Sequence, residues 1–136
     1  MNVSTFFNYP TEPPIGVQLP LAFWSTRSPR DWRKLLSLMQ TLRFRAGETV
    51  TRGNGFYVVG FGRFRTPTTT YEEGHALNIA TFFSGQPSRT PLTAQVDSEL
   101  LYLNRDAFEI FAAREPDLAR AVLFELGRIL AATQSA

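Results

Sequence analysis

Asp97-Ser98-Glu99-Leu100-Leu101-Tyr102-Leu103-Asn104-Arg105-Asp106-Ala107-Phe108 is the stretch that decides the fold, because the sequence changes from strands to helices within it. Leu100 to Leu103 form a short apolar run, as a buried strand requires, and a charged turn precedes them. Asn104 can cap a helix over residues 105–114, since its side chain can accept a hydrogen bond from an amide of the first turn. The stretch therefore predicts a strand that leads directly into a C-terminal helix.

A second C-terminal helix is expected to begin at Pro116, because proline suits the first position of a helix. Its apolar residues recur at helical spacing and form one stripe. Two alternatives stay open for this stripe: it covers its own domain, or it packs against a partner protein or a second copy of the chain. The stripe consists of Leu118, Val122, Leu126, Ile129 and Leu130.

Upstream of the decisive stretch, short apolar or alternating segments are separated by turn residues. Phe56 to Val59 is a predicted buried strand, and Thr81 to Phe83 is another short apolar piece in this strand region. Asn54-Gly55 is a dipeptide favoured in tight hairpins. Before the strands, residues 28–42 predict a helix with Ser28 as its N-cap and apolar residues on one face.

The order helix, short strands, two helices predicts an α+β domain. We expect an antiparallel β-roll, a jelly-roll-like barrel, flanked by one N-terminal helix and two C-terminal helices. Residues 1–20 contain four prolines and several aromatic residues, so they are expected to form an extended arm before a domain over residues 21–136. The arm is expected to pack on its own domain or on a partner through Phe6, Phe7 and Tyr9.

Composition narrows the possible functions of the 136 residues. The chain has no cysteine and one histidine, which excludes disulfides, thiolate sites and a histidine metal triad within one chain. No run reaches the ~18 apolar residues of a membrane span, and no secretory signal is visible, so a cytoplasmic location is expected. The net charge of +2 divides unevenly, because residues 1–70 hold nine basic and three acidic groups. This uneven distribution of charge between the two halves of the chain suits a protein partner or a head-to-tail contact.

No catalytic constellation is visible. His75 stands alone after Glu72-Glu73, and a polar role at a turn is its expected one. The glycine pairs at 53/55 and 60/62 give only G-x-G, which is no nucleotide-binding fingerprint. We expect no enzymatic activity and no metal.

The loop over residues 84–90 is the most specific candidate for a ligand-binding segment, although such turns are also common in surface loops. Turn amides, hydroxyl groups and an arginine together suit a phosphate group. The candidate residues are Ser84, Gly85, Ser88, Arg89 and Thr90.

These segments together resemble the cyclic-nucleotide-binding domain of catabolite-activator-type regulators, kinase regulatory subunits and gated channels. The resemblance extends over residues 19–132. The motifs that carry it are Phe44-Arg45-Ala46-Gly47-Glu48, Tyr57-Val58-Val59-Gly60-Phe61-Gly62, Phe83-Ser84-Gly85-Gln86-Pro87 and the stretch over residues 97–108. The resemblance implies a β-roll with a phosphate-binding cassette.

The cassette departs from the family pattern F-G-E-x-A-L at its functional positions. Its glycine is Asn78, the glutamate that holds the ribose is Ile79, and the small alanine is Thr81. Ser88 stands where the family has its phosphate-binding arginine, and Arg89 follows one residue later. A hydrocarbon side chain cannot accept a hydroxyl hydrogen bond, so the resemblance implies a degenerate ligand pocket.

The expected function is therefore a non-catalytic regulatory or scaffold module that does not bind cyclic nucleotide in the family manner and has no cofactor. The alternative is a sensor of cyclic nucleotide or another small anion, which would use Arg89 and backbone amides. A protein partner or a homo-oligomer is expected through the arm or the last helix. The segment after the last helix is too short for a helix-turn-helix, so no DNA binding by this chain alone is expected.

Overall fold

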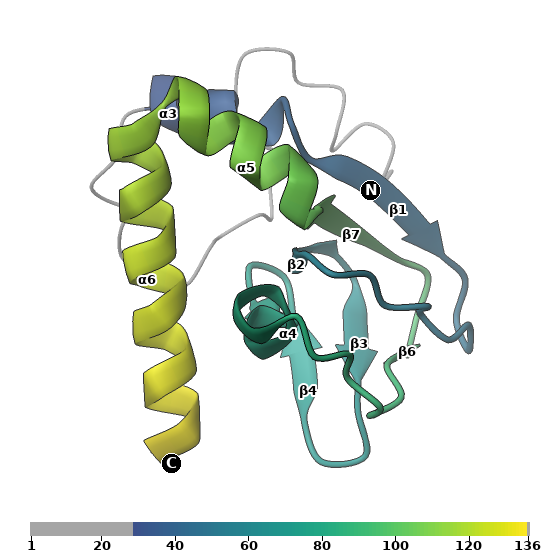
Figure 1. The fold of residues 1–136 in the computed structure, drawn as a ribbon. Helices are drawn as coiled ribbons and strands as arrows, with labels where there is room; N and C mark the ends of the chain where they lie inside the picture. Colours follow the sequence, from purple (N-terminus) through teal and green to yellow (C-terminus); the bar gives the residue numbers. More distant parts are fainter. Residues whose placement is uncertain (1–28, 136) are drawn as a thin grey trace.

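The computed structural model describes residues 29–135, which form a β-roll with helices along one side (Figure 1). The arm at residues 1–20, with Phe6, Phe7 and Tyr9, lies outside the described residues. The helices are α3 (Pro29–Leu36), α4 (Ile79–Ser84), α5 (Arg105–Arg114) and α6 (Pro116–Ser135). The strands are β1 (Gln40–Phe44), β2 (Phe56–Phe61), β3 (Arg63–Arg65), β4 (Thr70–Glu72), β5 (Ala76–Leu77), β6 (Thr93–Ala94) and β7 (Ser98–Leu103).

The strands form two sheets in which every pairing is antiparallel. One sheet has the order β1-β7-β2-β5 and the other has the order β4-β3-β6. Strand β2 carries an irregularity between Val59 and Phe61, after which Gly62 turns the chain into the second sheet at φ 86°. The predicted α+β class and antiparallel roll are thus confirmed.

Side-chain alternation along β2 divides the apolar core into two clusters. Phe56 and Val58 point to the helical side, where they pack with residues of α4, α5 and α6. Tyr57 and Val59 point into the roll, where they pack with Phe64 and other residues of both sheets. The long helix α6 lies along the helical side, and α5 connects it to β7 (Figure 1).

The junction between strand and helix follows the local signals of the sequence. The Asn104 side chain accepts a hydrogen bond from the amide of Ala107 over 2.7 Å, as an N-cap does. Helix α5 then runs to Arg114, and α6 begins at Pro116 as predicted.

Three predictions of local structure were wrong. The first helix ends at Leu36 rather than Leu42, because residues 40–44 pair with β7 as strand β1. Residues 81–83 lie in the helix α4 and not in a strand. Asn54-Gly55 does not form a hairpin, since β2 pairs with β5 and β7 and not with the strand before it.

The close approach of two backbones explains Gly55 better than a hairpin does. The backbone of Leu103 and Asn104 lies against this glycine and leaves no room for a side chain. The Asn54 side chain accepts from the Arg105 amide over 3.3 Å, which attaches the loop to the start of α5.

Candidate functional site

The segment that corresponds to the cassette consists of α4 and the loop after it. Asn78 precedes the helix in a left-handed conformation at φ 66°, and Gly85 ends the helix at φ 76°. Asn78 thus stands where the family pattern has glycine, the residue that adopts this conformation without strain.

The side chain of Asn78 attaches this segment to the loop before β2. Its Nδ2 donates to the carbonyl oxygens of Gly53 and Gly55 over 3.0 and 2.7 Å. Its Oδ1 accepts from Nη1 of Arg52 over 3.3 Å. Asn78 is buried, so these hydrogen bonds satisfy polar groups that water does not reach.

Ile79 is 5% exposed and belongs to the apolar cluster on the helical side of the sheet. Phe82, one turn further along α4, packs edge-on against Phe56 and Phe108 at ring distances of 5.3 and 5.2 Å. The position that the resemblance assigns to the ribose glutamate is thus occupied by a residue of the apolar core.

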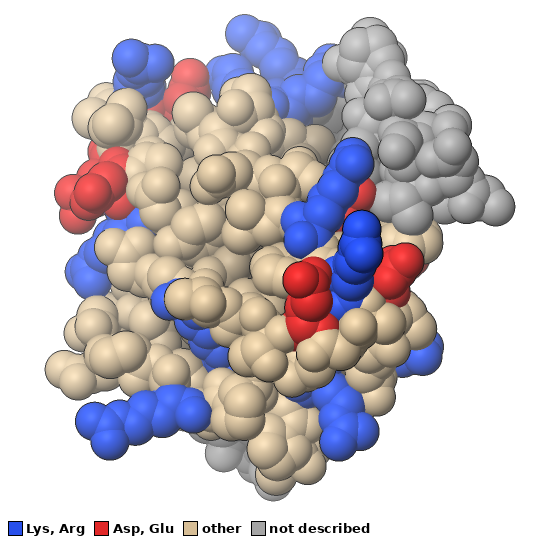
Figure 2. Space-filling model, turned by 90° about the vertical axis from the view of Figure 1, so that its right-hand side faces the viewer, with Lys and Arg blue, Asp and Glu red and all other residues tan. Residues whose placement is uncertain are grey.

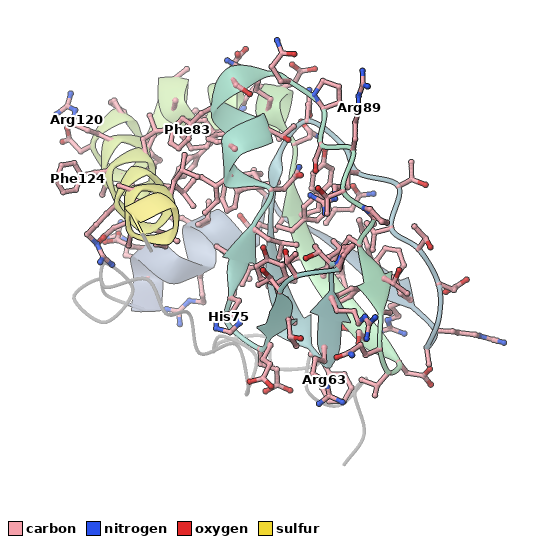
Figure 3. The ribbon with its side chains drawn as sticks, turned by 90° about the horizontal axis from the view of Figure 1, so that it is seen from below. Arg63, His75, Phe83, Arg89, Arg120 and Phe124 are labelled. Carbon is pink, nitrogen blue, oxygen red and sulfur yellow. The ribbon has the colours of Figure 1, made fainter. Side chains whose placement is uncertain are left out.

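Of the five predicted ligand residues, Ser84 ends α4 and the other four lie in the loop after it, where all but the half-buried Ser88 are exposed. The hydroxyl of Ser84 accepts from the amide of Gln86, and that of Ser88 accepts from the amide of Thr90. These hydroxyls thus stabilise the local turns. Arg89 is exposed and projects away from the roll (Figure 3).

Arg52 is a candidate residue that the sequence did not single out, because it lies in a glycine-rich turn cluster. Its Nε is buried and has no hydrogen-bond partner, and no described carboxylate forms an ion pair with it. Burial lowers the pKa of the guanidinium, while the neighbouring Tyr71 and Tyr57 act in the opposite direction. A half-buried guanidinium without a described carboxylate partner is the feature of this region that points to an anion.

The predicted stripe on α6 faces inward. Leu118, Val122 and Leu126 are buried in the apolar cluster of their own domain, and Ile129 is partly buried against it. The opposite side of α6 exposes Phe124, with 75% of its surface accessible, and the neighbouring Leu123. Figure 3 shows Phe124 projecting away from the rest of the domain.

His75 occupies a polar position at a turn, as predicted. Its Nδ1 accepts from the amide of Glu72 over 2.7 Å, and its ring meets Tyr71 edge-on. The described residues hold no group of three acidic or histidine side chains arranged for a metal. Among residues 29–135, none of the helices combines the length and the apolar character that crossing a bilayer requires.

No protein-family model and no curated protein matches this sequence. The structure, in contrast, is similar to solved structures. A cyclic nucleotide-binding domain from Methylobacillus flagellatus has a TM-score of 0.73 at 20% identity, over 80% of this chain and 69% of that one. The N-terminal domain of a transcriptional regulator from Streptomyces coelicolor has a TM-score of 0.70 at 20% identity, over 87% and 91%.

The catabolite activator protein of Thermus thermophilus has a TM-score of 0.64 at 21% identity, over 79% of this chain and 57% of that one. The chain therefore has the fold of a cyclic-nucleotide-binding domain, which confirms the resemblance at the level of fold. At this identity the comparison defines the fold and leaves function to the residues of the site.

Proposed function

We propose that this chain is a non-catalytic regulatory module that has the cyclic-nucleotide-binding fold, does not bind cyclic nucleotide in the family manner, and acts through contacts with protein. The observation that carries the proposal is the burial of Ile79 in the apolar core at the position of the ribose glutamate. A cyclic nucleotide bound in the family manner would lose charge-assisted hydrogen bonds worth ~1.5–3 kcal/mol each.

The second functional position of the cassette supports the same proposal. Ser88 replaces the arginine that would hold the cyclic phosphate, and its hydroxyl is already used by the amide of Thr90. The adjacent Arg89 projects into solvent (Figure 3), where an ion pair with a phosphate is weak. Both interactions that select the ligand are thus missing from their expected places.

The outer side of α6 is the surface that we propose for self-association with a second copy of the chain. Phe124 and Leu123 expose apolar side chains there, and Gly127 lies next to them with open space above its backbone. A glycine beside exposed aromatic and aliphatic side chains lets a second helix approach closely while it buries them. This surface replaces the inward-facing stripe as the interaction surface of the helix.

Size-exclusion chromatography coupled to light scattering tests the self-association. We expect the wild type to elute as a dimer and Phe124→Asp to elute as a folded monomer. Ile110→Asp is the matched control, because Ile110 is also exposed, at 55%, but lies on α5. A wild type that stays monomeric at the highest concentration reached, or equal dimerisation of Phe124→Asp, would contradict this surface.

A second candidate function, sensing of a small anion, is favoured by Arg52 rather than by Arg89. Arg52 is half-buried and forms no ion pair with a described carboxylate, so the accessible part of its side chain could bind a phosphate or carboxylate oxygen. Inorganic phosphate is the first probe: it should raise the melting temperature of the wild type and of Arg89→Gln but not of Arg52→Gln. Equal stabilisation of all three proteins would show that this effect is unrelated to Arg52.

A further inference from the structure

The outer side of α6 carries a line of residues that are spaced alternately three and four positions apart. This spacing puts them on one face of the helix. Arg120 and Phe124 project from this face, away from the rest of the domain (Figure 3). The side of the domain opposite α6 differs, because basic and acidic side chains lie next to each other there (Figure 2). We call the line the outer seam; it consists of Asp117, Arg120, Phe124, Gly127 and Ala131.

The size of the side chains changes along the outer seam. Arg120 and Phe124 are large and lie in its first half, whereas Gly127 and Ala131 are small and lie in its second half. A Cβ atom added to Gly127 would meet nothing within 4 Å, so packing inside the domain does not require a glycine there. A glycine inside a helix is destabilising relative to alanine. The close approach of another molecule would explain this glycine.

These sizes favour an antiparallel arrangement of two α6 helices over a parallel one. In a parallel pair each seam residue faces its own counterpart, so Phe124 meets Phe124 and Gly127 meets Gly127. Large side chains then collide at one level and small ones leave a void at the next. In an antiparallel pair, Phe124 faces Gly127 of the second copy. Arg120 then faces Ala131 in the same way, so every large side chain meets a small one.

Charge along the outer seam favours the same orientation. The guanidinium of Arg120 lies 3.8 Å from the carboxylate of Asp117 in its own helix, and both side chains are largely exposed. An exposed pair of this kind is weak and does not neutralise the arginine towards a second copy. A parallel pair would bring the two Arg120 side chains together. An antiparallel pair keeps them about 16 Å apart along the helix axis, the rise between residues 120 and 131.

We propose that two copies of this chain associate through their α6 helices in antiparallel orientation, with Phe124 of each copy seated over Gly127 of the other. This inference rests on the self-association proposed above and adds its orientation. The two-fold axis would cross the helix pair between residues 125 and 126, and both exposed phenyl rings would be buried. The two β-rolls would then point in opposite directions along the helix pair.

Disulfide cross-linking tests the orientation, because the chain has no cysteine of its own. Arg120→Cys and Ala131→Cys each place a thiol at an exposed position of the seam. A disulfide requires Cα atoms within ~7 Å of each other. We expect a mixture of the two variants to form a cross-linked dimer on mild oxidation, and each variant alone to remain uncross-linked. Glu73→Cys, at an exposed position on the roll, is the control for random collisions and should not cross-link with Arg120→Cys.

A charge introduced at residue 131 gives an independent test of orientation. In the antiparallel dimer, Ala131→Glu places a carboxylate opposite Arg120 of the second copy at two equivalent places. The dissociation constant of the dimer should therefore fall several-fold relative to the neutral control Ala131→Gln. In a parallel dimer the two glutamates would face each other, and the dissociation constant would rise. Analytical ultracentrifugation measures both constants.

Failure of the orientation and failure of the self-association give different results. If the wild type is a dimer by light scattering, three outcomes would overturn the antiparallel orientation alone. These are cross-linking of Arg120→Cys with itself, no cross-link in the mixture with Ala131→Cys, or a dimer of Ala131→Glu that is no tighter than that of Ala131→Gln. A wild type that stays monomeric would overturn both the orientation and the self-association.

Discussion

The side-chain amide of Asn78 donates to the carbonyl oxygen of Gly55 over 2.7 Å, and thereby attaches the start of the cassette helix to the loop before β2. The same amide also reaches Gly53, and Oδ1 accepts from Arg52. In the family pattern this position is a glycine, which cannot make such bonds. Asn78 thus adopts a left-handed backbone, which glycine adopts without strain, and its side chain also has a structural role.

Asn78→Ala is expected to reduce the free energy of unfolding more than Asn78→Gly does. Both variants lose the side-chain hydrogen bonds, at about 1–3 kcal/mol for the buried carbonyl groups left unpaired. Alanine also loses about 1–2 kcal/mol of stability because its Cβ disfavours the left-handed backbone, a cost that glycine does not have. Urea unfolding measures the difference, and equal losses would show that the backbone conformation at residue 78 is not strained.

Leu126→Ala and Phe124→Ala should separate the two sides of α6. Leu126 is fully buried, so its truncation should destabilise the fold by about 2–5 kcal/mol. Phe124 is mostly exposed, so its truncation should change the stability of the monomer by no more than about 0.5 kcal/mol. Chemical denaturation at a concentration where the protein is monomeric provides both values. Comparable losses of unfolding free energy in the two variants would mean that Phe124 is as buried as Leu126, so that α6 presents a different side to the domain.

Glu99 should contribute to the pH dependence of the free energy of unfolding. Burial raises the pKa of Glu99 in the folded state, and Arg43 only partly opposes this. The folded chain therefore binds this proton more tightly than the unfolded chain does, so stability falls as pH rises from the ordinary glutamate pKa of about 4.3 through the raised value.

Glu99→Gln removes that titration, so its stability relative to the wild type should increase over the same rise in pH. Urea unfolding of both proteins at several pH values measures the trend, and Glu73→Gln serves as the control because Glu73 is exposed. A stability difference between wild type and Glu99→Gln that is constant with pH would contradict the raised pKa.

Elements with strong local signals could be predicted from the sequence. The N-cap at Asn104 and the proline at residue 116 defined the starts of α5 and α6 without any tertiary information. The end of α3 could not be predicted in this way, because residues 40–44 continue the apolar spacing of the helix but gain strand pairing with β7. The six residues of α4 are too short for a periodic signal, and their start depends on the conformation of Asn78.

The candidate site was predicted less completely than the fold. The sequence identified Ile79 and Ser88 as departures from the cassette, since a pattern comparison needs only the order of residues. It did not identify Arg52, because this residue owes its importance to a half-buried guanidinium without a described carboxylate partner. Such a feature depends on what packs around the side chain, and the local sequence placed Arg52 in an ordinary turn.

Calorimetric titration of the wild type with cyclic AMP and with cyclic GMP tests the central claim most directly. Because Ile79 is buried in the apolar core and Arg89 projects into solvent, we expect no saturable binding heat with either nucleotide. Saturable, tight binding that Arg89→Ala abolishes would contradict the account, since it would show that the cassette still holds the cyclic phosphate.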